Sequence, residues 1–214
     1  MAHCSNQAVA VTRAFFDERA EKWDAMISAQ HAVRLRQIIE TLPIASDAHI
    51  LDVGCGTGVL FPILADILDT QGLVVAADVS FAMLRETRAR INALRQQRSL
   101  PAQLLLQADI THPPIHHSSF DWVICNSCFP HFLDQQRATT TMARLLRSKG
   151  ALVICHTESR NAINELHRTV GGAVGGHELP DASEMARLVE NAGLSLDTLT
   201  DEPDRYLLLA HRHA

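Results

Sequence analysis

The chain has 214 residues, of which 47% are hydrophobic and 20% are charged, and its formal net charge is -5. A chain of this length forms one domain with a core of its own. The acidic balance and the lack of a long basic run argue against nucleic acid as a partner. No apolar run approaches the ~20 residues that span a bilayer, and the polar first residues do not form a signal peptide.

Five cysteines are present, namely Cys4, Cys55, Cys125, Cys128 and Cys155. An odd number without framework spacing predicts reduced thiols and a cytoplasmic protein. Cys125 and Cys128 have the spacing of a redox motif. Cys125 falls inside an expected strand, however, which favours a packing role for this pair. Monomer and homodimer both stay open.

The first forty residues are expected to be helical. Phe15, Phe16, Arg19, Ala20 and Trp23 recur at helical spacing. A second helix fits residues 28–42, because Ser28 can cap its start and Pro43 follows its end.

From residue 46 the pattern alternates between apolar strands and helices. Strands are expected at 49–53, 72–78, 103–108, 120–126, 151–156, 194–199 and 205–211. Helices are expected to end near residue 68 and to span about 80–98, 134–147, 159–169 and 181–191. This alternation predicts an α/β fold with a mostly parallel seven-stranded sheet and helices on both faces. The short break at 202–204 predicts an antiparallel last strand.

A glycine-rich turn follows the first strand of this sheet. It reads Asp52-Val53-Gly54-Cys55-Gly56-Thr57-Gly58, and Asp78 ends the next strand 20 positions after Gly58. Glycines let the backbone approach a ligand closely, and a carboxylate at the second strand end can accept both hydroxyls of a ribose. The dinucleotide fingerprint G-x-G-x-x-G fails, because Val59 stands at its sixth position. The preceding acid suits a ligand with an ammonium group and no phosphates, which disfavours a nucleotide-dependent oxidoreductase.

These residues resemble the class I S-adenosylmethionine (SAM) dependent methyltransferase family, whose fold is Rossmann-like. The resemblance extends from Phe15 to the last strand. It implies that Asp52 and the glycine turn hold the methionine end of SAM, Asp78 the ribose, and Asp109 the adenine amino group. The implied cofactor contacts are Asp52, Gly54, Gly56, Gly58, Asp78, Val79, Met83, Asp109, Ile110 and Asn126.

The segment 15–24 is similar to the N-terminal cover of small-molecule members of this family. The resemblance therefore implies a helical lid over residues 1–45, with Trp23 beside the acceptor, and a SAM-binding domain over residues 46–214. The alternative is an amphipathic helix that only packs on the sheet. A lid would exclude water from methyl transfer.

The acceptor is expected beside the ends of the fourth and fifth strands. The fourth strand runs into Asn126-Ser127-Cys128-Phe129-Pro130-His131, which departs from the Asn/Asp-Pro-Pro-aromatic motif of enzymes that methylate bases or glutamine. His131 is a candidate base or acceptor contact, or else a helix cap. His156 ends the fifth strand, and an insertion at about 157–180 follows it as a pocket wall or a plain linker.

Within this insertion, Arg160, Asn164 and His167 share one helical face, and His177 lies in the Gly-rich stretch behind it. Two interpretations of the histidines stay open. They supply a general base with polar acceptor contacts, or they bind a divalent metal, although their spacings match no tight metal motif. The expected catalytic residues are His131, His156 and His167, and the expected acceptor contacts are Trp23, Arg160, Asn164 and His177.

The sequence thus predicts a SAM-dependent methyltransferase acting on a small molecule. The alternatives are a metal-dependent enzyme, or one acting on a metal or metalloid species, and a non-catalytic SAM-binding module. The lid and motifs resemble small C- and O-methyltransferases of quinone-biosynthesis type. The His-rich region after the fifth strand departs from that group, so the acceptor stays open.

Overall fold

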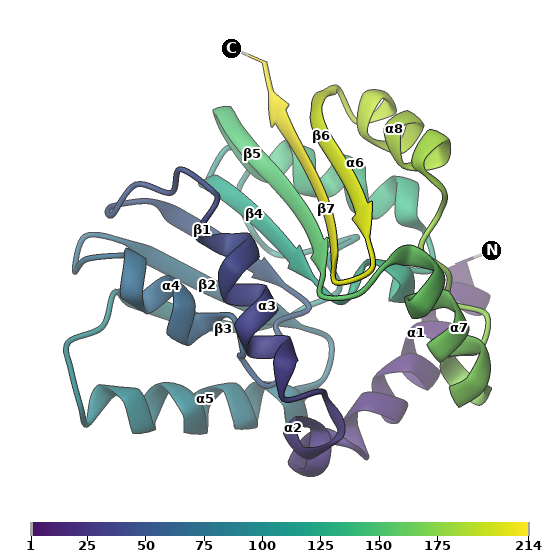
Figure 1. The fold of residues 1–214 in the computed structure, drawn as a ribbon, viewed down its shortest axis with the longest axis horizontal. Helices are drawn as coiled ribbons and strands as arrows, with labels where there is room; N and C mark the ends of the chain where they lie inside the picture. The colour runs from purple at the N-terminus through teal and green to yellow at the C-terminus, as the bar shows by residue number, and fades with distance from the viewer. Residues whose placement is uncertain (1, 214) are drawn as a thin grey trace.

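A computed structural model describes the backbone of residues 2–213 and the side chains of residues 7–213. One seven-stranded sheet has the order β3-β2-β1-β4-β5-β7-β6 (Figure 1). The strands are β1 (His49–Val53), β2 (Leu73–Asp78), β3 (Ala102–Gln107), β4 (Phe120–Asn126), β5 (Leu146–His156), β6 (Leu194–Glu202) and β7 (Arg205–Arg212). Within residues 2–213, no helix is both long and apolar enough to cross a bilayer.

The helices include three short 3-10 segments, labelled η. They are α1 (Ala2–Asp17), η1 (Ala20–Lys22), α2 (Trp23–Met26), α3 (Gln30–Ile39), α4 (Phe61–Ile67), α5 (Phe81–Arg95), η2 (Phe129–His131), α6 (Gln135–Leu145), α7 (Arg160–Val170), η3 (Gly172–Val174) and α8 (Ala182–Asn191).

Strands β1 to β5 pair in parallel, whereas β7 lies between β5 and β6 and is antiparallel to both. The chain proceeds from β1 outward to β3 and then restarts on the other side of β1 with β4. The strand order therefore reverses between β1 and β4, where ligands bind in open α/β sheets. The predicted fold class, a Rossmann-like sheet with an antiparallel last strand, is confirmed.

Two apolar layers cover the faces of the sheet. On one face α6, α8 and Ile163 of α7 pack on β4, β5 and β7. On the other face α3, α4 and Ile91 of α5 pack on β1, β2 and their neighbours. Alternate residues of each strand enter opposite layers, as in Val153 and Ile154 of β5. Burial on both faces explains why the central strands are apolar at nearly every position.

The start of β5 differs from the sequence-based prediction, which placed it at residue 151. The strand begins at Leu146, directly after α6. Gly150 therefore lies inside the strand. A Cβ at this position would lie 3.0 Å from the Arg147 carbonyl oxygen and 3.1 Å from those of Phe120 and Asp121, so glycine permits close approach to β4.

Side-chain caps set several helix starts where the sequence predicted them. Ser80, Asp134, Ser159 and Asp181 each accept a hydrogen bond from the backbone N–H three residues later. Each cap satisfies one of the unpaired donors of a first helical turn.

Asn164 anchors α7 to the segment that leads into α8. Its Nδ2 donates to the Leu179 carbonyl oxygen at 3.0 Å, and its Oδ1 accepts from the Leu179 N–H at 2.8 Å. The side chain is buried. The expectation that Asn164 contacts the acceptor is thus corrected, because both ends of its amide bind backbone inside the protein.

Replacement of this amide tests the anchor. Asn164→Ala leaves two buried backbone groups of Leu179 without partners, and we expect the free energy of unfolding to fall by about 2 kcal/mol. Asn161→Ala, at an exposed position of the same helix, is the matched control with an expected change within about 0.5 kcal/mol. Urea unfolding measures both, and equal stability of the two variants would contradict the assignment.

Candidate active site

A cavity of about 270 Å³ opens at the carboxyl ends of β1, β2 and β4. Residues of the turns after β1 to β4 form its floor and sides, and residues of α1, α2 and the segment before α3 form its roof. Its volume approaches the ~300 Å³ at the lower end of ligand pockets. It lies at the point where the strand order reverses.

The turn after β1 presents its backbone to this cavity. Gly54, Gly56 and Gly58 all adopt positive φ angles. The N–H groups of Gly54 and Cys55 donate to the Ala77 carbonyl oxygen at 2.8 and 3.1 Å, which fixes the turn against β2. A Cβ at Gly56 would meet nothing within 4 Å. The turn therefore leaves room for a ligand to lie directly against its backbone.

Asp52 lies beneath this turn rather than in the cavity wall. It is buried, and its Oδ2 has no hydrogen-bond partner among the described residues. Burial, and secondarily the charge of Asp78, raise the pKa of Asp52 to about 8. A nearby cationic group would favour the ionised carboxylate. The orphaned oxygen therefore fits a ligand with an ammonium group, as SAM has.

Asp78 ties the glycine turn to the start of α5. Its Oδ2 accepts from the Gly56 N–H at 2.9 Å and its Oδ1 from the Ser80 N–H at 2.8 Å. Burial raises the pKa of Asp78 in spite of these hydrogen bonds. Because the residue also lines the cavity, it can accept hydrogen bonds from ligand hydroxyls.

Most of the other expected cofactor contacts also line the cavity, namely Gly54, Gly56, Val79, Met83, Asp109, Ile110 and Asn126. Asp109 closes its own loop, since its Oδ1 accepts from the N–H and the hydroxyl of Thr111, both at 2.8 Å. Gly58 lies outside the wall, and a Cβ there would approach the Thr87 side chain to 2.9 Å. A groove rimmed by carboxylates and an open glycine backbone fits the polar groups of SAM.

Two aspartates hold the roof of the cavity, one to the start of α5 and one to the glycine turn. Asp17, at the end of α1, accepts from the Ser80 hydroxyl at 2.5 Å. Asp24, in α2, accepts from the Thr57 hydroxyl at 2.6 Å and pairs with Arg90. Sequence analysis predicted no partner for either acid, because these contacts join segments more than 30 residues apart.

Three of the four predicted histidines meet at the acceptor side. The Nδ1 atoms of His131 and His177 are 2.9 Å apart, and Nδ1 of His167 donates to the His177 carbonyl oxygen at 2.6 Å. The rings of His131 and His167 are 4.8 Å apart. His131 also lines the cavity, with Phe16 of α1 against its ring.

The environment keeps these imidazoles neutral. Burial, then His167 and His177, hold the pKa of His131 well below its usual value. Burial also lowers the pKa of His167 and of His177. Since the lowered values favour the unprotonated forms, His131 is available as a proton acceptor at neutral pH.

His156 lies behind this cluster and does not line the cavity. It is buried, its Nε2 has no partner among the described residues, and burial lowers its pKa to about 3. Its ring is 6.0 Å from that of Tyr206, the cross-strand neighbour on β7. Tyr206 was not singled out from the sequence, because strand pairing alone brings it to this edge.

Two residues expected to contact the acceptor remain, and only one of them lines the cavity. Trp23 lines the cavity, whereas Arg160 lies outside it, with its backbone N–H on Asp201. His31, which sequence analysis missed, lines the cavity and bonds Thr157 through Nδ1 at 2.9 Å. Among the residues with described side chains, no group of three or more His, Cys, Asp or Glu is placed to hold a metal ion.

Comparisons with known proteins identify the family of this chain. Residues 51–154 match the family described as a methyltransferase domain. The ubiquinone biosynthesis O-methyltransferase of Thiobacillus denitrificans is 29% identical over 201 residues, which cover 86% of this chain and 83% of that protein. The chain belongs to the class I SAM-dependent methyltransferase family.

One further relative and one solved structure are also similar to this chain. The demethylmenaquinone methyltransferase of Lactiplantibacillus plantarum is 28% identical over 71% of this chain and 64% of its own length. Magnesium protoporphyrin IX methyltransferase from Synechocystis, solved with bound S-adenosylhomocysteine, superposes with a TM-score of 0.71 at 16% identity, over 96% of this chain and 99% of that one. The second similarity concerns the fold alone.

Replacement of Asp78 tests the cofactor site of this methyltransferase. Asp78→Ala removes a buried acceptor that also orders the Gly56 backbone, and we expect the dissociation constant for SAM to rise more than roughly tenfold. Asp47→Ala, at an exposed position before β1, is the control. Calorimetric titration with SAM measures both, and an unchanged affinity of the Asp78 variant would remove the ribose assignment.

Proposed function

We propose that this methyltransferase transfers a methyl group to a hydroxyl of a small, largely apolar acceptor, with His131 as the general base. The observation that carries the proposal is the position of His131. Its imidazole lines the same cavity as the glycine turn, and His177 holds its Nδ1. The acceptor and the cofactor would thus meet beside a neutral imidazole.

Bound SAM supplies a methyl carbon that its sulfonium activates for displacement. The chain has to align the acceptor and to remove its proton. Asp52, Asp78 and Asp109 would hold the cofactor, and Asn126, at the end of β4, would lie near its methionine portion. Val79, Met83 and Ile110 would pack on the nucleoside.

His131 can act as base in one of its two neutral forms. With the Nδ1–H of His131 donating to Nδ1 of His177, Nε2 of His131 is left to accept a proton. His167 would position His177 through the bond to its carbonyl oxygen. His156, without access to the cavity, would act on this cluster through His167.

The acceptor class follows from the remaining wall of the cavity. Phe16, Trp23, Ile27, Phe132 and Leu133 present mostly apolar surface beside His131. An apolar wall with one base favours an aromatic acceptor that carries a hydroxyl. The ubiquinone biosynthesis relative supports such an acceptor, so catechols and hydroquinones are the compounds to assay.

We also propose that residues 1–45 act as a lid. Asp17 and Asp24 bond this segment to Ser80 and Thr57 on the cofactor side. Phe16 and Trp23 of the same segment line the cavity where the acceptor would bind. Closure of such a segment would exclude water from the transfer.

Loss of the imidazole tests the base. We expect His131→Ala to lower kcat on a catechol or hydroquinone acceptor by roughly a hundredfold or more, with SAM affinity within about twofold of the unchanged protein. His117→Ala, at an exposed position, should keep full activity. Transfer of label from radioactive SAM gives kcat. Equal turnover of both variants would exclude His131 as the base.

The pH profile gives an independent readout. The base must be unprotonated, and the pKa of His131 lies well below 6.5, so activity should hold as the pH falls through 6.5 and fade only at lower pH. A limb of kcat against pH at the ordinary histidine value of about 6.5 would contradict this environment of His131.

Metal removal distinguishes the general-base mechanism from the metal-dependent mechanism that the same histidines suggest. On the base mechanism, protein treated with chelator and shown metal-free by elemental analysis should keep its full turnover. Loss of turnover that Zn²⁺ or Mg²⁺ restores would favour the metal instead. Intact SAM binding without turnover on any acceptor would support a non-catalytic SAM-binding module.

A further inference from the structure

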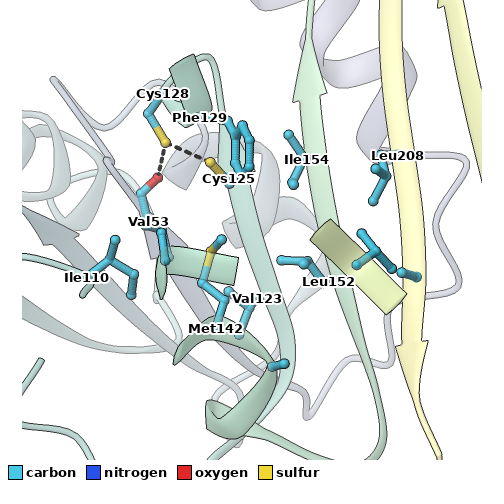
Figure 2. Packing of buried hydrophobic residues seen from close by; sticks show 14 of the residues in the cluster. Val53, Ile110, Val123, Cys125, Cys128, Phe129, Met142, Leu152, Ile154 and Leu208 are labelled. Carbon is cyan, nitrogen blue, oxygen red and sulfur yellow. Dashed lines mark hydrogen bonds between the residues drawn. The ribbon is translucent and has the colours of Figure 1, made fainter. Parts of the chain in front are cut away.

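Cys125 and Cys128 bring their sulfur atoms together at the end of β4. Between them, Ser127 adopts a φ of 55°, and its N–H donates to the Cys155 carbonyl oxygen at 2.9 Å. This left-handed residue turns the chain back on the strand, so that the two Sγ atoms lie 2.8 Å apart (Figure 2). The redox spacing seen in the sequence therefore corresponds to a real dithiol, despite the position of Cys125 in a buried strand.

One thiol of this pair forms part of the cofactor cavity. Cys128 lines the cavity, while Cys125 is fully buried behind it. Cys128 Sγ donates to the Val53 carbonyl oxygen at 2.9 Å, as Figure 2 shows. A Cβ added to Gly54 would lie 2.6 Å from both Cβ and Sγ of Cys128. The Cys128 side chain therefore supports the first residue of the glycine turn.

The other thiols with described side chains have different surroundings. Cys55 lies 3.7 Å from the Thr87 hydroxyl, and Cys155 lies 3.8 Å from Oδ1 of Asn126. Both are buried, and neither has a second sulfur at this distance. An oxidant that enters the cavity thus reaches Cys128 first, with Cys125 placed to react next.

We propose that Cys125 and Cys128 are an oxidisable dithiol that forms an internal disulfide and thereby weakens cofactor binding. With hydrogen peroxide as oxidant, Cys128 would take one oxygen atom to become a sulfenic acid and release one water. The Cys125 thiol would then attack that sulfur, form the S–S bond and release a second water. Two S–H bonds and one O–O bond break, and peroxide takes up the two electrons.

The effect on the cofactor follows from two contacts. A disulfide draws the sulfurs from 2.8 Å to about 2.05 Å, which shifts the Cys128 side chain that packs beside Gly54. The Val53 carbonyl also loses its thiol donor. Loss of one such hydrogen bond at the glycine turn predicts a SAM affinity lower by roughly threefold to tenfold.

Peptide mapping tests formation of the bond. Trypsin releases residues 99–137 as one peptide, because no Lys or Arg lies between Arg98 and Arg137, and Cys125 and Cys128 are its cysteines. Burial and the neighbouring Cys125 raise the pKa of Cys128, so the native protein is treated with excess peroxide at mildly alkaline pH. We expect this peptide to lose two hydrogen masses, reversibly with a dithiol reductant.

Two variants serve as controls for the mapping. The variants Cys128→Ser and Cys125→Ala are first shown to be folded by circular dichroism. Their tryptic peptide 99–137 should not lose the two hydrogen masses, whereas the same peptide from Cys55→Ala should still lose them. A native protein whose peptide keeps both hydrogens, while the urea-unfolded chain is oxidised, would overturn the proposal.

Titration with SAM before and after oxidation tests the coupling. We expect weaker binding in the oxidised protein, recovery on reduction, and slower oxidation when S-adenosylhomocysteine fills the cavity. An oxidised protein of unchanged affinity, or oxidation that the ligand does not slow, would overturn the link to the cofactor cavity. Failure of the reduced protein to bind SAM would contradict the methyltransferase assignment instead, while the peptide masses would still report on the dithiol.

Discussion

The hydrogen bonds from the turn after β1 to the Ala77 carbonyl are the constraint on which the site depends. They hold the turn against β2 and leave the Gly56 Cα facing the cavity. Asp78, one residue beyond Ala77, accepts from the Gly56 N–H and so closes the same unit from the other side. The two strand ends therefore position each other. The start of α5 and the roof aspartates are then attached to this unit through Ser80 and Thr57.

Electrostatics explains why this unit suits a cation. Asp52 and Asp78 are both buried at adjacent strand ends, and burial together with their mutual repulsion raises the pKa of Asp52 to about 8. An ionised pair is costly there without a positive partner. A ligand ammonium group offsets that cost, since it is attracted to both carboxylates. Two buried carboxylates thus disfavour a ligand phosphate here, which agrees with the failed dinucleotide fingerprint.

Sequence reasoning succeeded where the signal is local. Residues 49–53 and 120–126 were predicted to the residue, because apolar runs with turn residues on each side define buried parallel strands. Most of the residues expected to hold the cofactor line the cavity, and they were chosen from motifs of a few residues. The start of β5 was missed, because the fit of Gly150 depends on the neighbouring backbone of β4. The role of Asn164 was missed for a similar reason. A polar residue on a helical face suggests a ligand contact, and the sequence does not reveal that its partner is the Leu179 backbone.

The acceptor side shows where such reasoning ends. His131 follows β4, whereas His167 and His177 come from α7 and the Gly-rich stretch after η3, so their convergence depends on how the insertion folds back. Sequence analysis singled out the histidines but left both a metal centre and a general base open. The hydrogen bond between the Nδ1 atoms of His131 and His177 would leave Nε2 of His131 to accept a proton, as the proposed base requires. The residues expected to hold the cofactor stand in short motifs beside one strand reversal, whereas two of the three clustered histidines stand in the segment 157–180 after β5, whose path no local motif predicts.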